Sequence, residues 1–73
     1  MLKINREKVT ELKNGRTNKI IAQKVGCTET HITQLFLGNK KCSETLAKLL
    51  ILTCTDYDKY NLEEGIKEYF QKV

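Results

Sequence analysis

The chain of 73 residues is long enough for one small domain, near the lower size at which a single apolar core is stable on its own. It has little room for a deep catalytic cleft, and no apolar segment approaches the roughly 20 residues that a membrane span requires. The net charge of +4 is unevenly distributed: residues 1–48 contain ten Lys and Arg against four Asp and Glu, whereas residues 49–73 contain three against five. A basic part followed by a mildly acidic tail indicates one face for a polyanion.

The three cysteines, Cys27, Cys42 and Cys54, are odd in number and widely spaced, which is not the pattern of a disulfide framework. The first residues mix charged and apolar side chains too early for a signal peptide, so we expect reduced thiols in a cytosolic protein. Cys27 and His31 are four residues apart, but a structural zinc site usually has four ligands in paired motifs. We therefore predict no metal, no cofactor and no small-molecule ligand.

In chain order, the first predicted helix follows Asn5. This residue is a good N-cap, and Ile4 and Val9 have the spacing of a hydrophobic staple around it. The helix is predicted to end at Asn14–Gly15. No segment here or elsewhere alternates apolar and polar residues for long enough to predict a strand, so the predicted fold class is all-α.

Two short helices follow, each with its own start and stop. Thr17 caps the second helix and Gly26 ends it, while Thr28 caps the third and Gly38 ends it. Apolar residues at helical spacing predict that one face of each helix is buried. These inward residues are Ile21, Ala22, Val25, Ile32, Leu35 and Phe36.

The fourth predicted helix begins after Ser43, which is its N-cap. Its inward stripe is predicted to complete the core and consists of Leu46, Leu49 and Leu50. Ile51 and Leu52 lie outside that stripe, so this helix has more apolar surface than one small core needs.

Residues 55–73 form a predicted helical tail with two possible starts. Asp56 is one candidate cap, and Asn61 is the other, in an Asn-x-x-Glu box with Glu64. Gly65 costs such a helix about 1 kcal/mol relative to Ala. The apolar residues of the tail at helical spacing are Leu62, Ile66, Tyr69, Phe70 and Val73.

The second and third helices together satisfy the steric demands of a helix-turn-helix. Gly26 supplies the positive φ of a sharp turn, and Ala22 is small where the next helix crosses. Cys27 seals the corner, and Ile32 and Leu35 hold the third helix against the second. The polar residues left outward are Glu29, Thr30, Thr33 and Gln34.

The stretch "TNKIIAQKVGCTETHITQLFLGNKK", above all "AQKVG" and "QLFLGNK", resembles the helix-turn-helix of the Cro/cI-type repressors of lambdoid phages, an XRE-like family. The resemblance runs from about Val9 to Leu50 and fades beyond Cys54. It implies a compact bundle of about five helices that binds a pseudo-palindromic operator on double-stranded DNA as a two-fold homodimer. It also implies a repressor in the cytosol of a bacterial host, associated with the nucleoid, with the third helix in the major groove.

The resemblance further implies roles for particular side chains. Positions that read base edges match Glu29, Thr30 and Gln34, with Thr33 beside them, and Thr28 matches one that touches a thymine methyl group or a phosphate. Phosphate contacts fall to Asn18 and Lys19 at the start of the second helix and to the loop after the third. Together with His31, the predicted phosphate-binding residues are Asn18, Lys19, Asn39, Lys40 and Lys41.

Glu29 leaves two interpretations open, because the family more often has glutamine there. Its carboxylate can accept from cytosine N4, or it only complements the dipole of its helix, worth about 0.3–1 kcal/mol. It also sustains a rival function, in which the same scaffold binds a protein, for example as a phage inhibitor of a host enzyme.

We predict no enzymatic activity, because no carboxylate pair, nucleophile–base pair or phosphate loop is suitably placed. The surplus apolar surface predicts the homodimer interface. Its residues are Ile51, Leu52, Leu62, Ile66 and Phe70.

Overall fold

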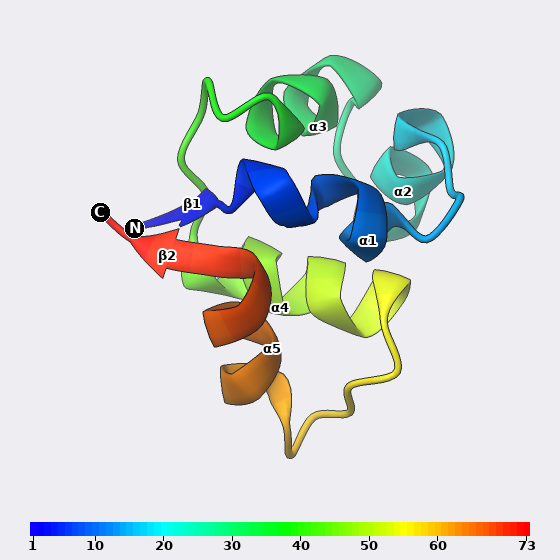
Figure 1. The fold of residues 1–73 in the computed structure, drawn as a ribbon. Coiled ribbons are helices and arrows are strands. Elements are labelled where there is room, and N and C mark those ends of the chain that lie inside the picture. The colour runs from blue at the N-terminus through cyan, green and yellow to red at the C-terminus, as the bar shows by residue number, and fades with distance from the viewer.

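Five α-helices account for most of the chain, and the structure, a computed structural model, describes all 73 residues (Figure 1). The predicted all-α fold is confirmed in that the chain is mostly helical, although the structure also contains a two-stranded sheet. The helices are α1 (Val9–Lys13), α2 (Asn18–Val25), α3 (Glu29–Phe36), α4 (Glu44–Cys54) and α5 (Leu62–Tyr69). None of them is long and apolar enough to cross a membrane.

Hydroxyl side chains fix the starts of three helices, as the sequence predicts. The Oγ1 atom of Thr17 accepts from the backbone N–H of Ile20 at the start of α2. Thr28 does the same at the start of α3, and Ser43 at the start of α4. Each bond satisfies one of the free N–H groups of a first helical turn, so the sequence sets these boundaries locally. Gly26 ends α2 with φ +78°, as predicted.

The start of the first helix differs from the prediction. A short 3-10 helix, η1 (Arg6–Lys8), follows Asn5, and α1 begins only at Val9. The Asn5 side chain makes no capping bond; instead its backbone N–H donates to the Tyr69 carbonyl at 2.8 Å. Asn5 therefore joins the two ends of the chain rather than capping a helix.

The first and last segments pair as a small antiparallel sheet that the sequence did not predict. Strand β1 (Leu2–Ile4) lies beside β2 (Phe70–Lys72), with Leu2 opposite Lys72 and Ile4 opposite Phe70. Leu2 also bridges to Cys42 on its other side, through two backbone hydrogen bonds. The prediction that the last helix continues through Phe70 to Val73 is thus wrong, because this segment pairs with a strand at the other end of the sequence.

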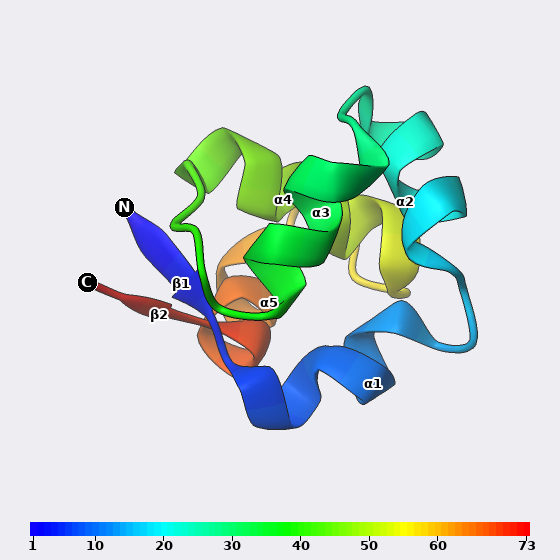
Figure 2. The same cartoon turned by 90° about the horizontal axis from the view of Figure 1, so that it is seen from above.

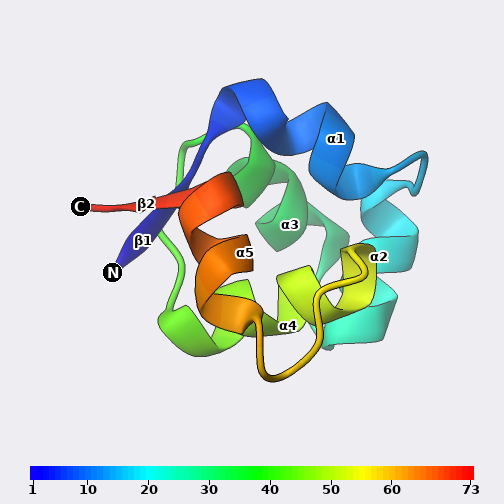
Figure 3. The ribbon, with the colours of Figure 1, turned by 60° about the horizontal axis from the view of Figure 1, so that its bottom comes forward.

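The last helix begins after Asn61, one of the two predicted starts. The Asn61 side chain makes no capping bond, so the predicted capping box does not form. Gly65 belongs to α5, which packs against α4 (Figure 3). A Cβ atom at Gly65 would lie 2.7 Å from Cγ2 of Ile51, so the glycine permits a close approach of the two helices.

The core contains side chains from all five helices and both strands. Its fully buried members include Leu12, Ile21, Ile32, Leu35 and Leu50. On α4 the buried face is Ala47, Leu50, Ile51 and Cys54, whereas Leu49 is 42% exposed. The predicted stripe was therefore wrong at Leu49 and Ile51, because α5 packs against α4 on the side of Ile51.

Candidate nucleic-acid interface

Helix α3 lies on the outside of the molecule with one face free. It is the uppermost helix in Figure 1, and in Figure 2, seen from above, it lies toward the viewer, with α2 on one side and the segment that follows α3 on the other. Its inner face is held by Ile32, Leu35 and Phe36, which are buried, and α2 is its main packing partner. The packing of α2 and α3 therefore presents one side of α3 to solvent.

The free side of α3 has the polar residues that the sequence placed there. Thr28, Glu29 and Thr30 are exposed at its amino-terminal end, whereas Thr33 and Gln34 are half-buried further along. His31 is half-buried too, and its backbone N–H is the donor to the Thr28 cap. Glu29 makes no ion pair in the structure. This end of α3 thus offers short polar side chains with few internal partners.

Asn18 links α2 to α3. Its Nδ2 donates to Oγ1 of Thr33 at 3.2 Å, while its Oδ1 is buried without a partner. The amide predicted to hold a phosphate is thus directed across the helix pair, and one Nδ2–H remains for another acceptor. Asn18 places the first turn of α2, with the exposed Lys19, beside the polar side of α3.

Asn39 holds Gln34 through two hydrogen bonds. Its Nδ2 donates to Oε1 of Gln34 at 2.9 Å, and its backbone N–H donates to the Gln34 carbonyl at 3.0 Å. The turn after α3 therefore fixes the side-chain amide of a predicted base-reading residue. Asn39 is exposed, as are Lys40 and Lys41 after it.

Two further cations, which the sequence did not predict as site residues, meet this turn. Gly38 has φ +82°, and a Cβ atom there would lie 3.1 Å from Cδ of Arg6 and 3.7 Å from Cε of Lys3. The stems of Arg6 and Lys3 thus lie against the glycine. We call Lys3, Arg6, Lys40 and Lys41 the Gly38 cluster. No local pattern predicts it, because β1 and η1 are distant from the turn in the sequence and reach it through long-range contacts, among them the pairing of Leu2 with Cys42.

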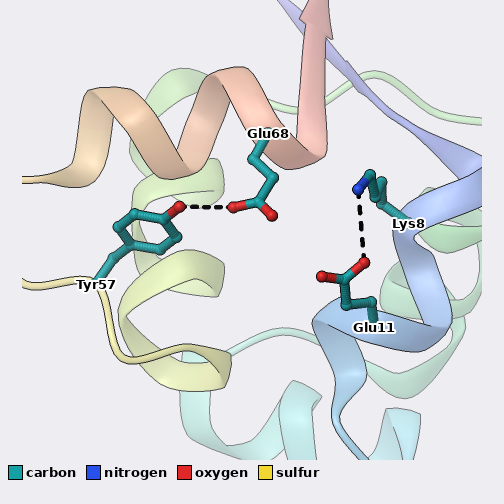
Figure 4. Close-up of polar contacts among 4 residues, drawn as sticks. All are labelled: Lys8, Glu11, Tyr57 and Glu68. Carbon is teal, nitrogen blue, oxygen red and sulfur yellow. Dashed lines mark hydrogen bonds and ion pairs between the residues drawn. The ribbon is translucent and has the colours of Figure 1, made fainter.

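None of these cations is neutralised within the chain. The two ion pairs are Lys8–Glu11 (Figure 4) and Lys48–Glu44, each at 3.6 Å, and neither involves Lys19 or the Gly38 cluster. Arg16, which the sequence places just before α2, is instead committed internally: its Nη1 donates to the Cys54 carbonyl at 3.2 Å. The free positive charge therefore lies on both sides of α3.

Most of the predicted dimer residues have no free surface. Ile51, Ile66 and Phe70 are buried in the core of the single chain, and Leu62 is half-buried. These predictions fail because α5 and β2 fold back onto α4 and β1. Leu52 remains exposed by 44% and has Leu49 as an exposed apolar neighbour one helical turn earlier.

Two cysteine thiols and one tyrosine hydroxyl of the chain have raised pKa values. Burial raises the pKa of the Cys42 thiol to about 11 and also raises the pKa of Cys54, which makes both thiols poor nucleophiles. The hydroxyl of Tyr57 donates to Oε2 of Glu68 at 2.6 Å (Figure 4), and this bond raises the pKa of Tyr57 to about 12. No group of three or more potential metal ligands lies together.

Comparison with known proteins gave no match: no family model, no curated protein and no solved structure is significantly similar to this chain.

Proposed function

We propose that the protein is a sequence-specific DNA-binding transcriptional regulator, of phage or mobile-element repressor type. In this proposal α2 and α3 form a helix-turn-helix, and α3 enters the major groove. The observation that carries it is the free polar side of α3 between two segments that contain unpaired, exposed cations (Figure 2). Lys19 belongs to α2, and Lys40 and Lys41 belong to the segment after α3. Short polar side chains suit base edges, and flanking cations suit phosphates.

Base reading is assigned to Glu29, Thr30 and Gln34, with Thr33 beside them. Gln34 is the residue best prepared for it, because its bond to Asn39 fixes the amide before DNA arrives. A glutamine amide pairs with N6 and N7 of adenine. Thr33 is partly committed to Asn18, so we assign it the smaller share.

The test is selection on random duplex DNA, repeated at several salt concentrations. We expect a two-fold symmetric consensus. Gln34→Ala should relax the base preference at one position of each half-site. Lys41→Ala should weaken binding to all sequences alike and reduce the slope of log K against log[salt] by about 0.9 per protomer, or about 1.8 for a bound dimer. Weak binding without any sequence preference would contradict the proposal.

A homodimer is part of the proposal, because a symmetric operator requires two copies of α3 about 34 Å apart. The surface available for it is the outer side of α4, where Leu49 and Leu52 are exposed. Sedimentation of wild type and Leu52→Glu tests this surface: we expect a dimer for the first and a monomer for the second. The same oligomeric state for wild type and Leu52→Glu, whether monomer or dimer, would contradict it.

One observation favours a second candidate function, a protein-binding module. Glu29 is exposed in the first turn of α3 without a cation partner, and phosphates repel a carboxylate. The selection experiment separates the two candidates, because a module that binds protein alone returns no consensus sequence.

A further inference from the structure

The amino-terminal segment and the turn after α3 meet at a single glycine. Gly38 has no side chain, and the space beside its Cα is filled by Cδ and Cγ of Arg6 and by Cε of Lys3. Any Cβ at this position would lie 3.1 Å from Cδ of Arg6, closer than ordinary van der Waals contact. The glycine thus lets two long cationic side chains lie across the turn that carries Lys40 and Lys41.

The charges of these four residues are directed to solvent. Arg6, Lys40 and Lys41 are exposed and Lys3 is half-buried, in keeping with side chains that pack their stems and leave their charged ends in water. The neighbouring Glu7 forms no ion pair with any of them. Positive charge also suits the carboxyl end of α3, but this effect is confined to the last turn and does not account for four cations.

We propose that the Gly38 cluster is a second phosphate-binding surface for the same duplex, to which Lys3 and Arg6 contribute as much as the loop lysines. The inference rests on the proposed function and extends the contact beyond α2, α3 and the loop to β1 and η1. Its partner is the sugar-phosphate backbone. Four cations held close together repel one another, and a polyanion relieves that repulsion. Lysine and arginine side chains in this cluster are not arranged on one helix that could present them to base edges. The Gly38 cluster is complete only when β1 is paired, since the pairing of Leu2 with Cys42 brings β1 and the turn after α3 together.

The experiment compares two double variants that each remove two positive charges. Lys3→Gln/Arg6→Gln keeps part of each stem against Gly38, and Lys59→Gln/Lys67→Gln is the matched control in the acidic part of the chain, where both lysines are exposed. Circular dichroism establishes that both are folded. Fluorescence anisotropy then gives the affinity for a random duplex and for the selected operator between about 50 and 200 mM salt.

We expect the first variant to lose affinity for both duplexes by the same factor. Its salt slope should fall by about 0.9 for each cation removed, which is about 1.8 per protomer and about 3.6 for a bound dimer. The control should keep the slope of the wild type. Equal slopes for the two variants would overturn the inference and leave the proposed function standing. If the wild type binds without sequence preference and the slope still falls, the proposed function fails and the cluster remains a polyanion contact. If the wild type binds no duplex at any salt concentration, both fail.

Discussion

Helices α3 and α5 have the same length but use their polar side chains differently. On α3 the exposed end has Glu29 and Thr30 without side-chain partners, and Gln34 is held at its amide by the following turn. On α5, Glu68 is bonded to Tyr57, and Gly65 brings the helix against α4. Helix α3 is packed along its inner face and leaves its outer face free, whereas α5 is held by contacts with α4 and Tyr57 that complete the fold. Free polar groups on a firmly packed helix are what a surface for an external partner requires.

The largest expected effect tests whether α5 covers the core residues of α4. Ile51→Ala should lower the free energy of unfolding by about 2–5 kcal/mol, because it removes a fully buried side chain beneath α5. An exposed residue of the same type is the control: Ile20, in α2, is 44% exposed, and Ile20→Ala should change stability by less than about 0.5 kcal/mol. Urea denaturation measures both. Similar losses for the two variants would mean that α5 does not cover Ile51 as described.

The next effect sharpens the role of the turn that holds α3. Asn39→Ala removes the donor to Gln34 Oε1, so discrimination at the Gln34 position should fall by about 0.5–1.5 kcal/mol, the net strength of one hydrogen bond. Asn39→Asp, which only accepts, should turn the amide around and change the preferred base. Binding to operators altered at single positions measures this. If both variants lose affinity uniformly and keep the same preferred base, Asn39 contacts phosphate only.

The smallest effect concerns the pair that fastens α5. Glu68→Gln removes the carboxylate that accepts from Tyr57, so the pKa of Tyr57 should fall from about 12 toward its usual 10. Because the raised pKa favours the neutral phenol in the folded chain, this pair supports the fold below pH 10 and loses that effect as the pH rises toward 12. Absorbance titration of the tyrosines, with Tyr57→Phe to assign the signal, measures it. A titration curve unchanged by Glu68→Gln would mean that the bond is absent in solution.

The difference between α3 and α5 also explains which helix boundaries the sequence predicts well. The boundaries of α2 and α3 follow from Thr17, Gly26 and Thr28, which act on backbone groups a few residues away. The end of α5 depends instead on β1, at the far end of the chain, and no pattern in a short window contains that partner. In the sequence Gly65 only lowers the predicted stability of its helix. Its role in the close packing of α5 against Ile51 becomes evident only in the structure.

The candidate site likewise contains residues that local sequence patterns predict and residues that only long-range contacts bring there. The polar residues of α3 were predictable from helical spacing, and their exposure follows from the burial of Ile32 and Leu35. Arg6 and Lys3 were not predictable, because they reach Gly38 through contacts between distant segments. The dimer residues were misassigned for a related reason: an apolar stripe does not reveal whether its partner is another copy or the chain's own last helix.

The meeting of β1 and β2 has a consequence for the order in which the chain folds. Leu2 and Lys72 lie almost at the two ends of the sequence, so their pairing closes nearly the longest loop available and costs the most chain entropy. The helices between them need only shorter closures, and we expect them to pack first. Lys3 lies in β1, the strand that we expect to pair last. We therefore expect the charge arrangement around Gly38 to be completed at the final step of folding and to be lost first when the chain ends separate.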